Sequence, residues 1–393
     1  MKKTGRVYPL ICIIDGLHVG LIVPALLAVL FFDTFDLFKT NTPPEWIFGI
    51  LLALPYCIKM LFLSVAKGIA HRVGVRATLI GTTAFFATGS FLTGLAFEVD
   101  SLALLVVSRI VLGFGMLTFP LMILTGSLGI FDPKMSMRIQ GYGITLGPLV
   151  GSLSLFKTLE IALPFYLAAI LCLFSLTLFL FTKIQETGKA KTFASKRFSP
   201  RFSELESEDV SMLLIALFFI HAAWTSYLYD APLFAFKLYR FSIEHLVILF
   251  TIFCLGLQIG LGIFSRWASR FGHKGVVIGS YIIVGLIMLL ETAPRTSYLL
   301  WILSAPAGIM AGIGYTHCMR IFQILSKNKQ IGDAGLFASI VQSFAAFVGL
   351  IAVGFFSSIK PFLPLISSFI LLCIGISFIL LGRFKRLEKE EVF

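Results

Sequence analysis

Long apolar runs alternate with short polar segments along the whole chain. Each run holds roughly 20 residues, which as a helix is long enough to cross a hydrocarbon core of about 30 Å. A helix also satisfies its own backbone hydrogen bonds, as a lipid environment requires. We therefore predict an all-α membrane protein with twelve transmembrane helices, at residues 8–31, 46–66, 77–97, 101–127, 139–156, 161–182, 211–234, 246–264, 275–293, 298–324, 335–358 and 362–382.

The polar segment 183–210 divides these spans six and six. Its first part is basic and its last part is acidic, which is typical of a solvated linker. We expect an N-terminal six-helix bundle at 1–182, a cytoplasmic linker at 183–210, and a C-terminal six-helix bundle with a short cytoplasmic tail at 211–393.

The two halves resemble each other at a nearly constant offset. Residues 67–76 (KGIAHRVGVR) align with residues 265–274 (SRWASRFGHK), 198 positions later. Residues 109–115 of span 4 align with residues 308–314 of span 10 at an offset of 199. Two matches at almost one offset indicate two pseudo-symmetric bundles of the same topology, an arrangement found in secondary transporters.

The amount and distribution of charge exclude a soluble protein. Only 13% of the residues are charged, whereas a soluble domain has about 25%. The net charge of +12 is spread unevenly, with most Lys and Arg residues on the side of the N-terminus. This bias follows the positive-inside rule, so we expect both termini in the cytoplasm of a bacterial cytoplasmic (inner) membrane and no nucleic-acid partner.

The sequence has no motif for catalysis or metal binding. It lacks a phosphate-binding loop, paired carboxylates at a hydrolytic spacing and a metal-ligand cluster, and its six cysteines all fall inside predicted spans. Thiols in that setting act as small apolar residues. We expect no enzymatic activity, no catalytic residue, no metal site and no cofactor, with transport driven by a proton gradient.

Three motifs point to one family. The loop after span 2 fits G-x-L-A-D-R-x-G-R-K, with His71 in place of the aspartate, and span 4 fits R-x-x-x-G-x-G. Span 5 contains GYGITLGPLVG (141–151), which fits G-x-x-x-G-P-x-x-G. The chain resembles the major facilitator superfamily, and within it the twelve-span drug:proton antiporter group. The resemblance implies conformational roles for Arg72, Gly74, Arg76, Gly113, Gly115, Gly143, Gly147, Pro148, Gly151, Arg270 and Gly272.

The glycines and the proline of span 5 are poor helix formers. Glycines four residues apart let another helix approach closely. A proline kink would in addition shape the contact through which the two halves separate. Close packing alone and packing combined with a kink are both compatible with the sequence.

Ionisable groups at membrane depth are functional candidates because they are costly there. Asp15 in span 1 and Lys59 in span 2 lie at a similar depth, Arg109 in span 4 approaches that level, and His18 shares a helix face with Asp15. We predict that Asp15, Lys59, Arg109 and His18 form the proton-coupling group. A purely structural ion pair and a cavity-lining role for Asp15 are the alternatives.

Further polar and aromatic residues in the spans are candidates for the substrate cavity. Histidine suits a proton relay, and aromatic rings stack on cationic or aromatic ligands, although core packing also explains both residue types. The candidates are His221, Trp224, Tyr227, Gln258, His317 and Gln342. Asp230, late in span 7, is expected at the outer interface.

Together these features predict a secondary active transporter that works by alternating access as a functional monomer. Proton-coupled efflux of a small molecule is the leading interpretation. Uptake of a metabolite, nutrient or siderophore is the alternative, and Lys59 would then hold an anionic substrate. A membrane sensor or assembly factor is the alternative outside transport. The expected partners are a small-molecule substrate, protons and the lipid bilayer.

Overall fold

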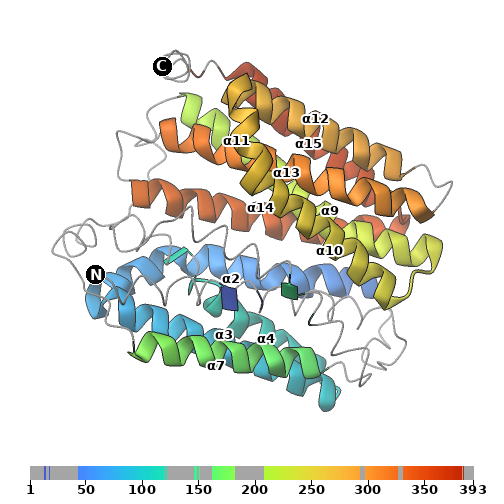
Figure 1. The fold of residues 1–393 in the computed structure, drawn as a ribbon. Coiled ribbons are helices and arrows are strands. Elements are labelled where there is room, and N and C mark those ends of the chain that lie inside the picture. Colours follow the sequence, from blue (N-terminus) through green and yellow to red (C-terminus); the bar gives the residue numbers. More distant parts are fainter. Residues whose placement is uncertain are drawn as a thin grey trace. The chain divides into compact units, whose positions relative to one another are not determined.

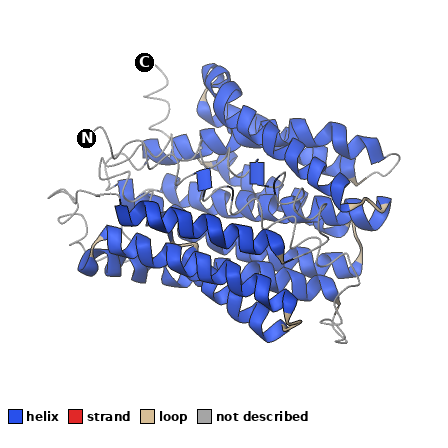
Figure 2. Cartoon of the chain, turned by 60° about the horizontal axis from the view of Figure 1, so that its bottom comes forward, coloured by secondary structure: helices blue, strands red, loops and turns tan. Residues whose placement is uncertain are grey.

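The computed structural model describes residues 13–14, 17, 43–118, 120–121, 146–147, 150, 162–181, 208–292, 297–325, 331–382 and 384. The described parts are built from helices, and no strand occurs among them (Figures 1 and 2). The chain forms two compact units, Met1–Ser199 and Pro200–Phe393. The division falls within the predicted linker, most of which lies outside the described residues.

Unit 1 contains four long described helices: α2 (Pro44–Val73), α3 (Val75–Glu98), α4 (Leu102–Gly115) and α7 (Leu163–Phe181). Helix α3 packs against both α4 and α7, and α4 also packs against α2. The Ser101 side chain caps α4 by accepting a hydrogen bond from the Leu104 N–H. Isolated described residues at 13–14 and 17 are helical, within predicted span 1.

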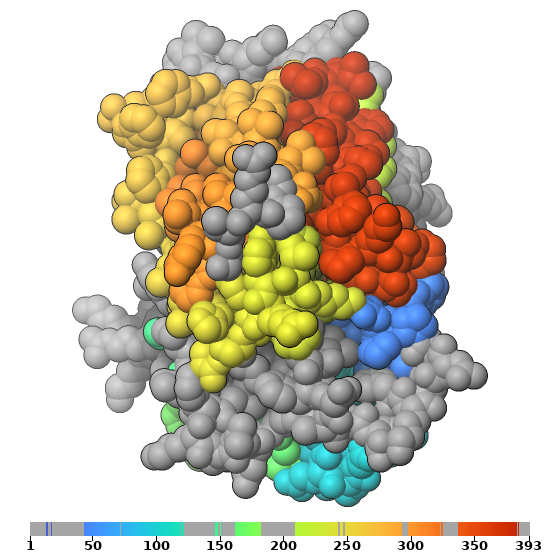
Figure 3. Space-filling model, turned by 90° about the vertical axis from the view of Figure 1, so that its right-hand side faces the viewer, coloured from blue at the N-terminus to red at the C-terminus, as the bar shows by residue number. Residues whose placement is uncertain are grey.

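Unit 2 contains six long helices: α9 (Glu208–Tyr239), α10 (Ile243–Ile259), α12 (His273–Glu291), α13 (Ser297–Leu325), α14 (Ile331–Ile359) and α15 (Leu363–Leu381). Three short elements join α10 to α12, namely the π-helix η3 (Gly260–Phe264), α11 (Ser265–Ala268) and the 3-10 helix η4 (Ser269–Phe271). Helix α9 packs against α14 and α15, and α13 packs against α10 and α12. Figure 3 shows the end of this unit where α9 (yellow) passes into α10.

Within the described residues, nine helices are long and apolar enough to cross a membrane, and α4 is a shorter apolar helix. They match the predicted spans 2–4 and 6–12, with ends that differ by a few residues, apart from α4, which ends at Gly115, while residues 122–127 of predicted span 4 lie outside the described residues. Many large apolar side chains point outward, for example Phe181, Ile263 and Ile302. Such exposure fits a lipid-facing surface.

The internal repeat seen in the sequence is also present in the packing. A Cβ on Gly113 of α4 would lie 2.5 Å from the Ile58 side chain of α2, and one on Gly115 would lie 2.6 Å from the Phe86 Cα of α3. In unit 2, Gly312 of α13 presses on the α10–η3 backbone and Gly314 presses on the Tyr281 ring of α12. In both units the two equivalent glycines, Gly113 and Gly115 in α4 and Gly312 and Gly314 in α13, let one helix touch two neighbours closely.

Replacing Gly312 by valine is expected to destabilise the protein. Its side chain would collide with backbone atoms, including Leu261 N at 2.7 Å, and overpacking of this kind costs about 1–3 kcal/mol. Thermal unfolding in detergent measures the effect. Gly279→Val is the matched control, because a side chain on Gly279 of α12 meets nothing within 4 Å. Equal stability of the two variants would show that the contact is not tight.

The motif loops contribute a second repeated feature. Gly74 and Gly272 both adopt positive φ, 93° and 75°, and each sits immediately before a helix. Two residues after each of these glycines, a cation at the start of the following helix caps the last described helix of the same unit. Arg76 donates to Phe179 O at 3.3 Å and to Leu180 O on α7, and Lys274 donates to Leu380 O at 3.1 Å and Gly382 O at 2.8 Å after α15. Cations at helix C-termini bind otherwise unpaired carbonyl groups.

Arg76→Met and Lys274→Met should each lower the free energy of unfolding by about 1 kcal/mol, the net contribution of such hydrogen bonds. The two losses should be similar, because both cations cap the equivalent helix. Arg72→Met is the control, since Arg72 is exposed. Thermal unfolding of the three variants tests this role, and a Lys274→Met protein as stable as Arg72→Met would refute it.

Candidate functional site

Arg109 is the most buried cation among the described residues of unit 1. Its side chain is only 2% exposed. Its guanidinium donates to Thr93 Oγ1 at 3.1 Å and lies 6.0 Å from the centre of the Phe165 ring. Ser108 Oγ lies 3.0 Å from the same threonine hydroxyl. The sequence predicted a charge at membrane depth here, and the structure places the Thr93 hydroxyl of α3 against it, with Ser108 of α4 next to that threonine.

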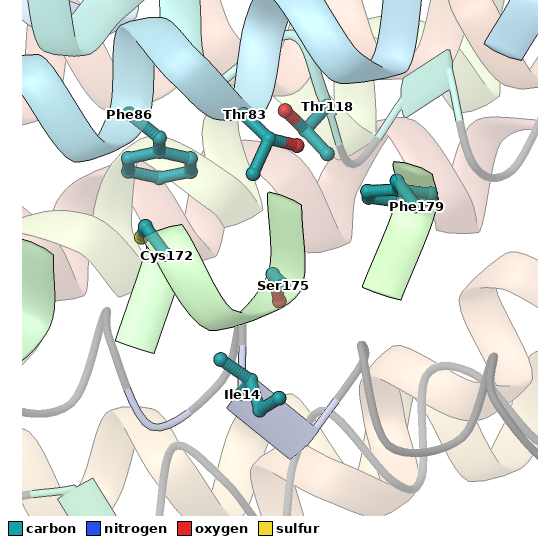
Figure 4. Close-up of a pocket in the computed structure, with 7 residues that line it drawn as sticks. All are labelled: Ile14, Thr83, Phe86, Thr118, Cys172, Ser175 and Phe179. Atoms are coloured by element: carbon teal, nitrogen blue, oxygen red, sulfur yellow. The ribbon is translucent and has the colours of Figure 1, made fainter. Parts of the chain in front are cut away.

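A small pocket lies beside the same helices. It encloses about 10 Å³, room for at most one water molecule. Figure 4 shows Thr83 and Thr118 on one side of it, with Cys172 and Ser175 on the facing helix α7. The buried hydroxyl oxygens of Thr83 and Ser175 have no hydrogen-bond partner. Ile14, next in sequence to Asp15, also lines the pocket, so this polar region adjoins span 1.

The other predicted coupling residues are only partly covered by the structure. Lys59 is half-buried on α2. Asp15 and His18 lie outside the described residues. The predicted grouping of these side chains around Arg109 therefore stays a prediction.

Unit 2 contains a buried acidic pair that the predicted site does not include. Tyr227 of α9 donates a hydrogen bond of 2.9 Å to Glu291 Oε1 at the end of α12. Asp230, one turn after Tyr227, accepts a bond of 3.3 Å from Ser357 of α14. Asp230 is 0% and Glu291 is 2% exposed, and the second oxygen of each carboxyl group has no hydrogen-bond partner.

The surroundings of this pair combine one cation with aromatic rings. Lys237 donates to the Ser357 carbonyl at 3.3 Å and acts electrostatically on Asp230, as Glu291 does. The Tyr227 ring contacts Phe253 of α10, with ring centres 5.8 Å apart. Tyr227 and Phe253 also line a pocket of about 20 Å³ with Ser304 of α13. The acids are therefore enclosed by four helices of one unit.

Asp230 was expected at the outer interface of the membrane. It lies nine residues before the end of α9 and is fully buried among the helices of unit 2, and α9 extends beyond predicted span 7. Glu291 was missed because it stands near the end of predicted span 9, where acids usually face water. The sequence does contain a signal for Glu291, because this acidic residue lies inside the predicted boundary of an apolar span.

The predicted cavity residues separate into different environments. Trp224 is buried against Tyr227 and Phe253 and hydrogen-bonds Tyr281. Gln342 donates to the Tyr315 hydroxyl at 3.4 Å. His221 and Gln258 are half-buried. His317 is 2% exposed, at the opposite end of unit 2 from Glu291, and contacts His273. The structure thus brings Trp224 and Tyr227 together, within a core of aromatic rings.

The motif residues also divide into groups. Gly74, Arg76, Gly113, Gly115 and Gly272 have the turn, capping and packing contacts given above. Arg72 and Arg270 are exposed. In span 5, Gly147 is helical and buried, whereas Gly143, Pro148 and Gly151 lie outside the described residues.

Comparison with known proteins decides the family. A family model described as "Major Facilitator Superfamily" matches residues 10–350. The chain belongs to the major facilitator superfamily. No curated protein sequence matches the chain. Among solved structures it is similar to the crystal structure of the human organic anion transporter MFSD10 (TETRAN), with a TM-score of 0.69 and 15% identity over 95% of this chain and 98% of that one. At this identity the likeness shows the fold.

Membership of the superfamily makes this chain a multi-pass secondary transporter and not an enzyme. It also explains the paired glycine contacts and the paired caps, since the two halves of such transporters are related by a repeat. A proton-driven member needs ionisable groups shielded from water. Arg109 in unit 1 and the pair Asp230 and Glu291 in unit 2 are such groups.

Proposed function

We propose that this transporter exports a small molecule in exchange for protons, by alternating access. The observation that carries the proposal is the buried pair of carboxyl groups in unit 2, each with one oxygen that lacks a hydrogen-bond partner. A carboxylate charge enclosed in this way is costly within a membrane. Binding a proton removes that charge, and water reaching the site in another conformation lets the proton leave.

The two acids offer a means of coupling because Asp230 interacts electrostatically with Glu291 and with Lys237. In the state described here Tyr227 holds one oxygen of Glu291 and Ser357 holds one oxygen of Asp230. A conformational change that moves α9 relative to α12 or α14 would break these bonds and expose the acids. Exchange of a proton would then depend on the same movement that carries the substrate.

Unit 1 supplies a second candidate group for coupling. We propose that Asp15 exchanges a proton there, with Lys59, Arg109 and His18 adjusting it. Export is favoured over uptake by the resemblance of residues 141–151 to an exporter motif. The proposal places the protein as a monomer in a bacterial cytoplasmic membrane, with both termini in the cytoplasm and no cofactor.

A second candidate substrate class is an organic anion, with uptake as the second candidate direction. The two basic residues at membrane depth in unit 1, Lys59 and Arg109, favour a negatively charged substrate. The similar solved structure is that of an organic anion transporter, which agrees with this alternative.

Proton movement in energised inside-out vesicles tests the proposed function. Tetraphenylphosphonium, ferrichrome and benzoate would be added in turn, as an organic cation, a siderophore and an organic anion. Loss of the interior acid gradient with one of them, absent in vesicles without the protein, is the expected result and identifies the substrate class. If a compound is transported in whole cells while the vesicle gradient stays constant, proton-coupled export is wrong.

A further inference from the structure

Basic and aromatic side chains share an outer surface of unit 2, at the end where α12 starts. Figure 1 shows α11 there, between α10 and α12. Ser265 and Ala268 of α11 are buried against the rest of the unit. The residues of η3, α11 and η4 that we call the basic–aromatic surface are exposed instead: Ile263, Arg266, Trp267, Arg270 and Phe271.

The apolar part of the basic–aromatic surface is a stripe of three residues that are four positions apart. Ile263, Trp267 and Phe271 are 68%, 59% and 67% exposed, and residues four apart lie on the same face of a helix. The Trp267 and Phe271 rings contact each other, with centres 5.6 Å apart. A continuous exposed apolar stripe of this kind marks a surface that binds lipid or another apolar partner.

The length of the helical segment places the stripe at the membrane surface. The apolar segment Glu244–Phe271 has 28 residues, which as a helix extend over about 42 Å. The hydrocarbon core is only about 30 Å thick. The last turns of the segment therefore reach the lipid headgroups, which is the depth at which tryptophan is enriched.

The basic part of the surface consists of Arg266 and Arg270. They are exposed, are also four positions apart, and each directly precedes one of the two aromatic residues of the stripe. Long basic side chains near the end of a membrane helix extend toward the headgroups. An arginine guanidinium binds a phosphate group through two parallel hydrogen bonds. The two arginines are therefore suited to a phosphate group beside the apolar stripe.

The surroundings of the two arginines are also basic. Residues 260–290 contain no Asp or Glu. Arg320, a further exposed arginine, acts electrostatically on His317, whose ring lies 3.0 Å from the Ser265 carbonyl oxygen. Asp209, at the start of α9, accepts a hydrogen bond of 3.0 Å from a backbone N–H after α15. A basic cluster at headgroup depth attracts anionic lipids.

Unit 1 has a different surface at the equivalent positions of the repeat. The residues aligned with Arg266, Trp267, Arg270 and Phe271 are Gly68, Ile69, Arg72 and Val73. Ile69 and Val73 are exposed, but they are aliphatic. Unit 1 thus forms the same loop with one arginine and no aromatic ring. The repeated fold therefore does not require the basic–aromatic surface, and a separate role explains it.

We propose that the basic–aromatic surface binds one anionic phospholipid. Its phosphate group lies between the guanidinium groups of Arg266 and Arg270, and its acyl chains lie along Ile263, Trp267 and Phe271. The proposal goes beyond the transport activity, and it does not depend on the proposed coupling groups or substrate.

Quenching of Trp267 fluorescence in the full-length protein, reconstituted in bilayers, tests the site. Phosphatidylglycerol is the anionic probe and phosphatidylcholine is the neutral one, each carrying bromine atoms near the headgroup end of its acyl chains. The chain has four tryptophans, so each protein is compared with the same protein carrying Trp267→Phe, and the difference reports on Trp267. We expect Trp267 to prefer phosphatidylglycerol, with each arginine contributing a factor of about five.

Arg266→Gln and Arg270→Gln should each lower this preference about fivefold. Arg72→Gln is the matched control and should leave it unchanged, because Arg72 is the exposed arginine of unit 1 that aligns with Arg270. Equal quenching by the two lipids in the wild type would overturn the proposal. An equal loss in Arg72→Gln would also overturn it, because net charge would then explain the preference. So would a loss on adding inorganic phosphate at constant ionic strength, because the site would then bind a soluble anion.

Discussion

Glu291→Gln is expected to reduce substrate-driven proton movement to the level of liposomes without protein, while the protein stays folded. Glutamine keeps an oxygen that can accept the 2.9 Å bond from Tyr227, and it has nearly the same volume. It cannot bind or release a proton. The substitution thus removes the proposed chemistry and retains the packing. Proton movement in proteoliposomes measures the loss of proton coupling, and thermal unfolding of the same preparation measures whether the packing is retained.

The control for this prediction is Glu98→Gln, at the exposed end of α3, which should transport like the wild type. Asp230→Asn should share the loss, because its carboxyl group is equally buried and interacts with Glu291. If Glu291→Gln retains full proton movement and Asp15→Asn loses it, coupling belongs to unit 1 and our interpretation of the buried acids is wrong.

Arg109→Ala should lower the free energy of unfolding by about 1.5–3 kcal/mol, the contribution of a hydrogen bond that involves a charged group. The substitution leaves Thr93 Oγ1 without its guanidinium donor and opens space beside Phe165. Denaturation in detergent measures the change. Arg320→Ala is the matched control, because Arg320 is an exposed arginine on the helix of unit 2 that corresponds to α4.

Arg109→Met separates packing from charge. Methionine fills much of the space, so we expect a protein more stable than Arg109→Ala that nevertheless lacks transport. A stable Arg109→Met protein with wild-type transport would show that the cation is not part of the transport cycle. Equal stabilities of Arg109→Ala and Arg320→Ala would show that the buried contacts contribute nothing.

The fold could be predicted from the sequence because a lipid environment permits few backbone structures. Apolar runs had to be helices, and the repeat at 198–199 residues had to place equivalent glycines and cations at equivalent positions. The contacts of Gly113 with α2 and of Gly312 with α10 follow from that repeat. The capping role of Arg76 and Lys274 does not, since it depends on where α7 and α15 end in space.

The buried acids were harder to predict because depth along a helix does not fix burial. Asp230 and Glu291 both stand near the end of a predicted span, where charged residues normally reach water by snorkelling. Here α9 continues past Asp230, and α14 supplies Ser357 beside it. The pairing of His317 with His273 likewise joins residues 44 positions apart, and a single sequence carries no signal for such a contact.

The most direct test of the central claim is substrate accumulation in proteoliposomes after an imposed pH jump. The purified transporter would be reconstituted into liposomes with an acidic interior. The compound that was transported in the vesicle experiment would be present at the same concentration inside and outside at the start. Proton-coupled exchange predicts accumulation inside above the external concentration, lost when a protonophore dissipates the gradient. Equilibration to the external concentration, with or without the gradient, would contradict proton coupling.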